Sequence, residues 1–375
     1  MTTERLEELL RDITRKKSIA QAVVAVESGD RELRWIGTRG ETSSGDGLAE
    51  DTPFFIASID KLYNATIAMM LNEAALFDVD KPISAYLSTS ITSGLHRYRG
   101  SDFSAKVTVR HLLTHTSGLA DWLEDYPKGG LNLFERIILE GDKALSVDEM
   151  AAYVRDQLKP HFPPQNLSES RPKARYSDTN YMLVIAVIEA VTGEPLNKVH
   201  ERILYKPLGL QHTYFPGQSR PMAPEREPMV LRAKGEPLHI PLLIKSVRGI
   251  YSTADDMITF MRALMQGKVF RASETLATML GGWHRFGFPL DRAAIRSPGW
   301  PIEYGTGVMR FRLPRLFTPA APMPSVLGHT GSTGCWLFFC PDLDVLLAGS
   351  VDEVTAGAVP FRIVPRILSA LRNSK

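Results

Sequence analysis

Apolar and polar residues follow strand-like patterns at both ends of the chain. Residues 20–27 and 31–37 alternate on either side of a short polar turn, which predicts a β-hairpin. Near the other end, three further segments have the composition of strands, namely residues 305–313, 327–340 and 345–351. Strands contributed by both chain ends predict one antiparallel sheet that brings those ends together.

Helical spacing marks the first and last segments and much of the middle. Apolar residues in 1–17, among them Leu6, Leu9 and Ile13, recur at the spacing of an amphipathic helix, and so do those of residues 361–371. Between the predicted strands the chain is mainly helical, with loops rich in proline and glycine.

Together these patterns predict the fold class and the domain organisation. We expect an α/β protein of the α+β type, with an antiparallel sheet from both chain ends, flanking helices and a mostly helical inserted lobe. Residues 1–57 and 300–375 would form the sheet lobe, and residues 58–299 the helical lobe. An active site is expected in the cleft between the two lobes.

Composition narrows the class of protein only slightly. The chain has 375 residues, 44% of them hydrophobic and 23% charged, which is enough to bury a sizeable core. The formal net charge of +2 predicts no nucleic-acid partner. No apolar run has the length needed to span a bilayer, so no membrane association is expected. The oligomeric state stays open.

The cysteines and the first 17 residues indicate the cellular compartment in which the protein is expected. Cys335 and Cys340 are five positions apart in one predicted strand, so their side chains point to opposite faces and cannot form a disulfide. The first 17 residues are charged and amphipathic, unlike a secretory signal. Both observations predict a cytoplasmic protein.

A serine and a lysine three residues apart carry the most chemistry. Ser58 and Lys61 stand at the start of an apolar helix, where residues i and i+3 share one face, so the lysine amine lies within reach of the serine hydroxyl. The alternative is a helix cap with a lysine that extends to solvent. A second match to the same spacing, Ser170 and Lys173, lies in a polar loop and is attributed to chance.

Two later segments favour catalysis. Tyr176 stands in a short polar loop that enters an apolar helix, and a glycine-rich segment, residues 328–334, precedes an apolar strand. In this order the three elements resemble the S-x-x-K, Y-x-N and K-T-G or H-x-G signatures of the serine β-lactamase and penicillin-binding-protein family. Residues 109–119, 206–210 and 249–257 add to the resemblance, which covers nearly the whole chain. It is strongest to the class C branch, which includes family VIII carboxylesterases, D-amino-acid peptidases and amide hydrolases.

The resemblance implies a mechanism and a set of site residues. Ser58 would attack an ester or amide carbonyl, and Lys61 and Tyr176 would together accept its proton, as a pair that titrates nearer neutrality than either group alone. The oxyanion would lie between the backbone N–H groups of Ser58 and Ser332, next to Gly331. No metal or organic cofactor is expected. His111 and His115 are four apart like zinc ligands, but no glutamate lies between them, and we assign them structural or capping roles.

Two departures from the lactamase signatures shape the expected substrate. His329 replaces the lysine of K-T-G and is mostly neutral at pH 7, which weakens the site for a substrate carboxylate. Asp178 replaces the asparagine of Y-x-N; it can accept a hydrogen bond from Lys61 but cannot donate one to a substrate carbonyl.

Both changes favour small neutral esters over β-lactams. A carboxylesterase is therefore the first hypothesis, a D-amino-acid amidase or peptidase the second and a β-lactamase the third. An acyltransferase would use the same residues, and a non-catalytic binding protein of the same fold is the remaining alternative.

Overall fold

One eight-stranded antiparallel sheet organises the molecule. The computed structural model describes residues 2–16, 18–169, 172–288, 290–317 and 322–372. The strand order is β2-β1-β14-β13-β12-β11-β10-β9, with every neighbouring pair antiparallel. The strands of this sheet are β1 (Ala22–Ser28), β2 (Arg34–Arg39), β9 (His284–Arg285), β10 (Glu303–Tyr304), β11 (Met309–Phe311), β12 (Val326–Thr330), β13 (Trp336–Cys340) and β14 (Val345–Val351).

Helices cover both faces of the sheet. α1 (Thr2–Thr14) and α14 (Val359–Arg372) pack together on one face, and α11 (Ala254–Met265) packs on β1, β13 and β14. β1 is buried along both faces. On one face, Val23 and Ala25 belong to the apolar cluster that includes α11. On the other face, Ala22, Val24 and Val26 belong to the cluster that includes α1 and α14. A strand covered on both sides is expected to be largely apolar, which explains residues 22–26 of β1.

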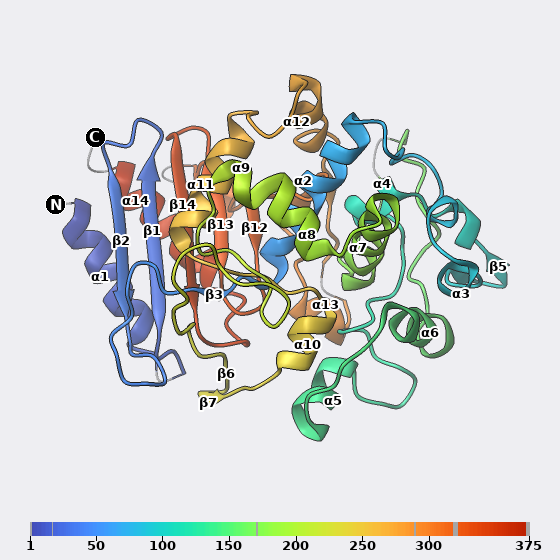
Figure 1. Cartoon of the computed structure of the whole chain (residues 1–375), viewed down its shortest axis with the longest axis horizontal. Helices are drawn as coiled ribbons and strands as arrows, with labels where there is room; N and C mark the ends of the chain where they lie inside the picture. Colours follow the sequence, from blue (N-terminus) through green and yellow to red (C-terminus); the bar gives the residue numbers. More distant parts are fainter. Residues whose placement is uncertain (1, 17, 170–171, 289, 318–321, 373–375) are drawn as a thin grey trace.

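Most of the remaining helices lie beside the sheet, on the right of Figure 1, whereas α9 lies next to α11. The remaining helices are α2 (Asp60–Glu73), α3 (Thr89–Thr92), α4 (Val109–Leu113), α5 (Leu133–Glu140), α6 (Val147–Gln157), α7 (Asp178–Thr192), α8 (Leu196–His200), α9 (Lys206–Leu208), α10 (Pro241–Ser246), α12 (Ser273–Met279) and α13 (Arg292–Arg296). Single helical turns occur at η1 (Ala57–Ile59), η2 (Ile83–Ala85), η3 (Ser104–Lys106) and η5 (Arg315–Phe317), and a π-helical turn at η4 (Glu201–Tyr205). Three two-stranded pairs complete the elements: β3 (Phe54–Phe55) with β8 (Tyr251–Ser252), β4 (Arg97–Tyr98) with β5 (Ser101–Asp102), and β6 (Arg232–Ala233) with β7 (Glu236–Pro237).

The predicted fold class is confirmed: both chain ends build the antiparallel sheet, helices flank it, and the middle is mostly helical. One detail of the strand prediction is wrong. Residues 327–340 form two strands rather than one, because the chain turns at Gly334, where φ is +72°, and β13 folds back against β12. Within the described residues, no helix is long and apolar enough to cross a membrane.

The division into two lobes stays a prediction. Residues 58–299 include segments that contact the sheet directly, among them α11, which packs on β1, β13 and β14, and β9, which extends its edge. Any boundary between lobes must therefore assign these segments to the sheet.

Candidate active site

Ser58 stands on a tight elbow between β3 and α2. The residue before it, Ala57, has φ of +43°, a left-handed conformation that is costly for a residue with a Cβ and is typical of functional sites. The end of β12 packs on this elbow: a Cβ added to Gly331 would lie 2.8 Å from the Ala57 Cβ and 2.9 Å from the Ile56 carbonyl oxygen. Glycine at 331 thus allows the third predicted motif to approach the first.

The structure brings the predicted catalytic side chains together. Lys61 Nζ donates to Ser58 Oγ at 3.0 Å, and Tyr176 Oη donates to the same oxygen at 2.7 Å. Asp178 Oδ1 lies 2.6 Å from Lys61 Nζ and accepts from Tyr176 Oη at 3.5 Å. The four residues therefore form one connected polar cluster around the Ser58 hydroxyl.

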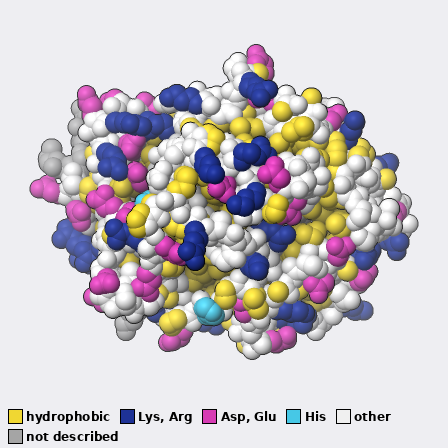
Figure 2. All heavy atoms as spheres, viewed as in Figure 1, with side chains coloured by type: hydrophobic (Ala, Val, Ile, Leu, Met, Phe, Trp, Pro, Cys, Tyr) yellow, Lys and Arg dark blue, Asp and Glu magenta, His cyan; other side chains and the backbone are white. Residues whose placement is uncertain are grey.

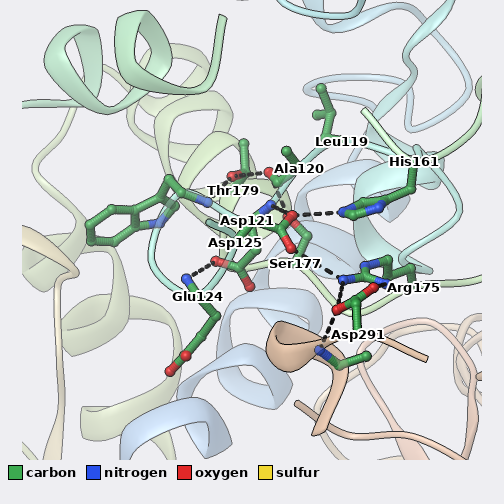
Figure 3. A network of polar contacts seen from close by, with 12 residues as sticks. Leu119, Ala120, Asp121, Glu124, Asp125, His161, Arg175, Ser177, Thr179 and Asp291 are labelled. Atoms are coloured by element: carbon green, nitrogen blue, oxygen red, sulfur yellow. Dashed lines mark hydrogen bonds and ion pairs between the residues drawn. The ribbon is translucent and has the colours of Figure 1, made fainter. Parts of the chain in front are cut away.

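A polar network that includes Asp121, Asp125 and Arg175 surrounds the start of α7 (Figure 3). The carboxylate of Asp121 accepts from the backbone N–H of Asp178 at 3.0 Å. Asp125 accepts from the Asp121 N–H at 2.8 Å and pairs with Arg175 at 3.2 Å. Arg175 also pairs with Asp291 at 2.8 Å. The loop at residues 119–126 is thus bonded to the residues on both sides of Tyr176.

Backbone contacts strengthen the same junction. Thr179 Oγ1 donates to the Ala120 carbonyl at 2.6 Å and accepts from the Trp122 N–H at 2.9 Å. Ser177 Oγ donates to the same carbonyl at 3.2 Å. These bonds hold Trp122, which lines the cavity described below, in register with the start of α7.

The protonation states of Lys61 and Tyr176 differ from the prediction. Burial lowers the pKa of Lys61, but the opposing effects of Asp178, Tyr176 and Asp60 outweigh it and raise the pKa well above the ordinary lysine value. Burial, reinforced by Asp178, raises the pKa of Tyr176 well above that of a free phenol, although Lys61 opposes the shift. The prediction that this pair titrates near neutrality is therefore wrong. At neutral pH the site holds a lysine ammonium and a neutral phenol.

Asp60 is a site residue that the sequence analysis missed. Its side chain is buried beside the cavity, and its Oδ1 lies 3.8 Å from Lys61 Nζ without a hydrogen-bond partner among the described residues. Burial, partly offset by Lys61, raises the pKa of Asp60 from 3.8 to about 7. Its position inside the S-x-x-K motif was visible, but its burial was not.

This shift predicts that Asp60 destabilises the folded protein increasingly as pH rises. Between about pH 4 and pH 7 the unfolded chain has lost the Asp60 proton while the folded protein still holds it, so this group's contribution to stability falls as pH rises. Asp60→Asn removes the ionisation, and its gain in stability over wild type is expected to grow by about 2.5 kcal/mol from pH 5 to pH 8. Thermal unfolding at both pH values measures the gain. Asp342→Asn, at an exposed position, is the control; a gain independent of pH would contradict the assignment.

His115 and His111 are both buried, and burial lowers the pKa of each. His115 Nδ1 accepts from the Ser177 N–H at 3.2 Å and from Asn180 Nδ2 at 2.9 Å, and its ring lies 4.6 Å from the Tyr176 ring. Burial, helped by Lys61 and His329, lowers the pKa of His115 well below 6.5. His111 instead caps α4, where its Nδ1 accepts from the Thr108 N–H at 3.1 Å.

His329 lies behind the site rather than in its wall. Its Nε2 is 3.0 Å from Tyr304 Oη and its Nδ1 is 2.7 Å from the Thr330 carbonyl oxygen. Burial, reinforced by Lys61, lowers the pKa of His329 to about 3. Thr330, Gly331 and Ser332 line the cavity, whereas His329 does not. The strand end therefore presents backbone and small side chains to the cavity, and no charge from position 329.

A cavity of about 700 Å³ opens at Ser58, Lys61, Tyr176 and Asp178. Its wall is mostly apolar and includes parts of α5, α6, α7 and α10 on one side and of β11 and α14 on the other. Three cations line it, and each has a carboxylate partner: Lys61 pairs with Asp178, Arg248 with Glu189 at 3.4 Å, and Arg296 with Glu135 at 3.2 Å. Among the described lining residues, no cation is left unpaired.

The fold and this cluster define the class of protein. The family model described as Beta-lactamase matches residues 6–357. The chain belongs to the β-lactamase family, and within it to hydrolases of the β-lactamase fold.

Individual relatives carry different activities in their names. The chain is 25% identical to esterase EstB of Burkholderia gladioli over 338 residues, which are 81% of this chain and 79% of that protein. It is also 25% identical to PbpX of Bacillus subtilis, named as a penicillin-binding protein, over 72% of this chain and 63% of that protein, so the match spans less than two thirds of that relative's length.

A solved structure extends the likeness to the whole chain. The D-stereospecific amidohydrolase from Streptomyces sp. is 26% identical, with a TM-score of 0.72 and 99% of both chains covered. The family is thus established, and the choice between ester and amide substrates rests on this chain's own cavity.

Proposed function

We propose that the protein is a serine carboxylesterase that forms an acyl-enzyme at Ser58 with neutral esters. The observation that carries this proposal is the pairing of every described cation in the cavity wall with a carboxylate. A substrate carboxylate, which β-lactams carry, would have to displace one of these partners. An uncharged ester binds such a cavity without that cost.

The contacts of Ser58 support a proton relay that differs from the one inferred from the sequence. Because Lys61 is an ammonium, it serves as a fixed positive charge that stabilises the developing alkoxide of Ser58. Tyr176 accepts the Ser58 proton and passes its own toward Asp178, whose carboxylate is within 3.5 Å of the phenol oxygen. An asparagine at position 178 would lack this capacity to accept a proton.

The remaining steps follow from the same arrangement. Ser58 Oγ bonds to the ester carbonyl carbon, and the carbonyl oxygen becomes an oxyanion held by the backbone N–H groups of Ser58 and Ser332. As the ester C–O bond breaks, Tyr176 returns the proton to the leaving alcohol. Water, deprotonated through the same relay, then releases the acid and regenerates Ser58.

A D-amino-acid amidase is the second candidate. Asp60 and Glu124 both line the cavity, and a carboxyl group there can meet a substrate ammonium. Burial raises the pKa of Glu124 to about 7, however, and Arg296 already lies 3.6 Å from it. The name of the Streptomyces relative, a D-stereospecific amidohydrolase, favours this second candidate. An acyltransferase would share all these residues and differ only in the acceptor of the acyl group.

A hydrolysis panel separates these functions. We expect kcat/KM for the best p-nitrophenyl ester to exceed that for nitrocefin and for D-amino-acid anilides by roughly 10- to 100-fold, the value of one charge-assisted hydrogen bond that the cavity does not offer. Initial rates with purified protein measure the ratios. Nitrocefin turnover equal to that of the best ester would contradict the proposal, and a preference for D-anilides would establish the second candidate.

A further inference from the structure

One face of α7 runs from the reacting groups into the apolar part of the cavity. Asp178, Met182 and Ile185 are spaced i, i+4 and i+7, so they share a face, and all three line the cavity. Asp178 lies beside Lys61. Met182 and Ile185 follow it by about 6 Å and about 10 Å along the helix axis. We call Met182 and Ile185 the α7 stripe.

Apolar side chains from other elements complete the wall around the α7 stripe. Trp122 and Phe134 line the same cavity, as do Met150 of α6 and Leu243 of α10. They belong, with the α7 stripe, to one apolar cluster or pack against it. On the face shown in Figure 2, apolar side chains also gather around α10. This part of the cavity is therefore suited to an alkyl chain.

The position of Tyr176 indicates whether the acyl chain or the alcohol of an ester binds along the α7 stripe. Its ring belongs to the other apolar cluster, together with Ile302 and Phe311, which line the cavity on the sheet side. Tyr176 must meet the leaving oxygen to return the proton, so the alcohol departs on that side. The acyl chain is then directed along the α7 stripe.

We propose that the α7 stripe binds the acyl chain of the substrate, and that the preferred substrates are esters of medium-chain carboxylic acids. This inference rests on the proposed esterase function and replaces the expectation of small esters, because acetate would leave the α7 stripe empty. Each buried methylene contributes roughly fourfold to binding. An acyl chain that contacts both Met182 and Ile185 is therefore expected to bind much more tightly than an acetyl group.

Chain-length profiles test the proposal. We expect kcat/KM of wild type for p-nitrophenyl octanoate to exceed that for the acetate at least tenfold. Met182→Trp fills the cavity near Ser58 and is expected to reverse this ratio. Ile185→Trp fills it further along and is expected to reduce only laurate relative to butyrate. A parallel series of alkyl acetates, from ethyl to octyl, varies the alcohol instead of the acyl chain. Both tryptophan variants are expected to keep the wild-type ratios of kcat/KM within this series.

Controls separate a blocked pocket from a damaged protein. Leu76→Trp adds the same side chain at an exposed position and is expected to keep the wild-type profile. A wild type that prefers acetate, or tryptophan variants with unchanged profiles, would overturn the proposal. A loss confined to octyl acetate would also overturn it, because the α7 stripe would then hold the alcohol.

Labelling of Ser58 tests the pocket without turnover. Octyl fluorophosphonate is expected to label wild type at least tenfold faster than ethyl fluorophosphonate, and Met182→Trp is expected to remove the difference. Equal rates for both reagents in wild type would overturn the proposal. Faster octyl labelling without hydrolysis of any ester would overturn the esterase function and leave the α7 stripe as an alkyl-binding site.

Discussion

Ser58→Ala is expected to lower kcat/KM for every accepted ester by roughly 10⁴-fold or more and to abolish covalent labelling by fluorophosphonates. Both Lys61 and Tyr176 donate to this hydroxyl oxygen, and alanine at position 58 removes it, so the cluster loses its nucleophile. Loss of one hydroxyl at a helix start is expected to cost only about 1 kcal/mol of stability. Steady-state rates and intact mass after labelling measure the effect.

The chain offers a matched control for this substitution. Ser170 has the same spacing to Lys173 as Ser58 has to Lys61, although Ser170 lies outside the described residues. Ser170→Ala is expected to keep wild-type turnover and labelling. Turnover retained in folded Ser58→Ala would place the nucleophile elsewhere and contradict the proposed mechanism.

Tyr176→Phe is expected to lower both acylation and deacylation by roughly 10²- to 10⁴-fold. The variant keeps the ring, which packs against His115 and Phe286, and removes only the oxygen that links Ser58 to Asp178. Lys61, as an ammonium, cannot take the proton instead. The burst and the steady state of p-nitrophenol release measure the two steps separately.

Tyr205→Phe is the control for this variant. Its hydroxyl is equally buried but has no hydrogen-bond partner among the described residues, and it lies outside the cavity wall. A Tyr176→Phe enzyme with wild-type rates would show that Lys61 alone activates Ser58.

Local patterns predicted the sheet, the flanking helices and the Ser58–Lys61 pair, because each depends on spacing along a short segment. Tyr176 is 118 positions beyond Ser58, and only the resemblance of the three motifs connected them. Asp121 gave no signal, since its role is to accept a backbone N–H from a helix that begins 57 residues later. The pKa shifts were predicted in the wrong direction because Asp60 and Asp178 both surround Lys61 only in the folded chain.

The pairing of β1 with β14 has a consequence for how the protein is made. Ala22 faces Val351, so this strand pair joins two segments that are far apart in the sequence. Until β14 leaves the ribosome, β1 and β2 form only an isolated hairpin, and an isolated hairpin is marginally stable at best. During translation the exposed edge of β1 is open to pairing with other chains. Closure over so long a loop also predicts slow folding.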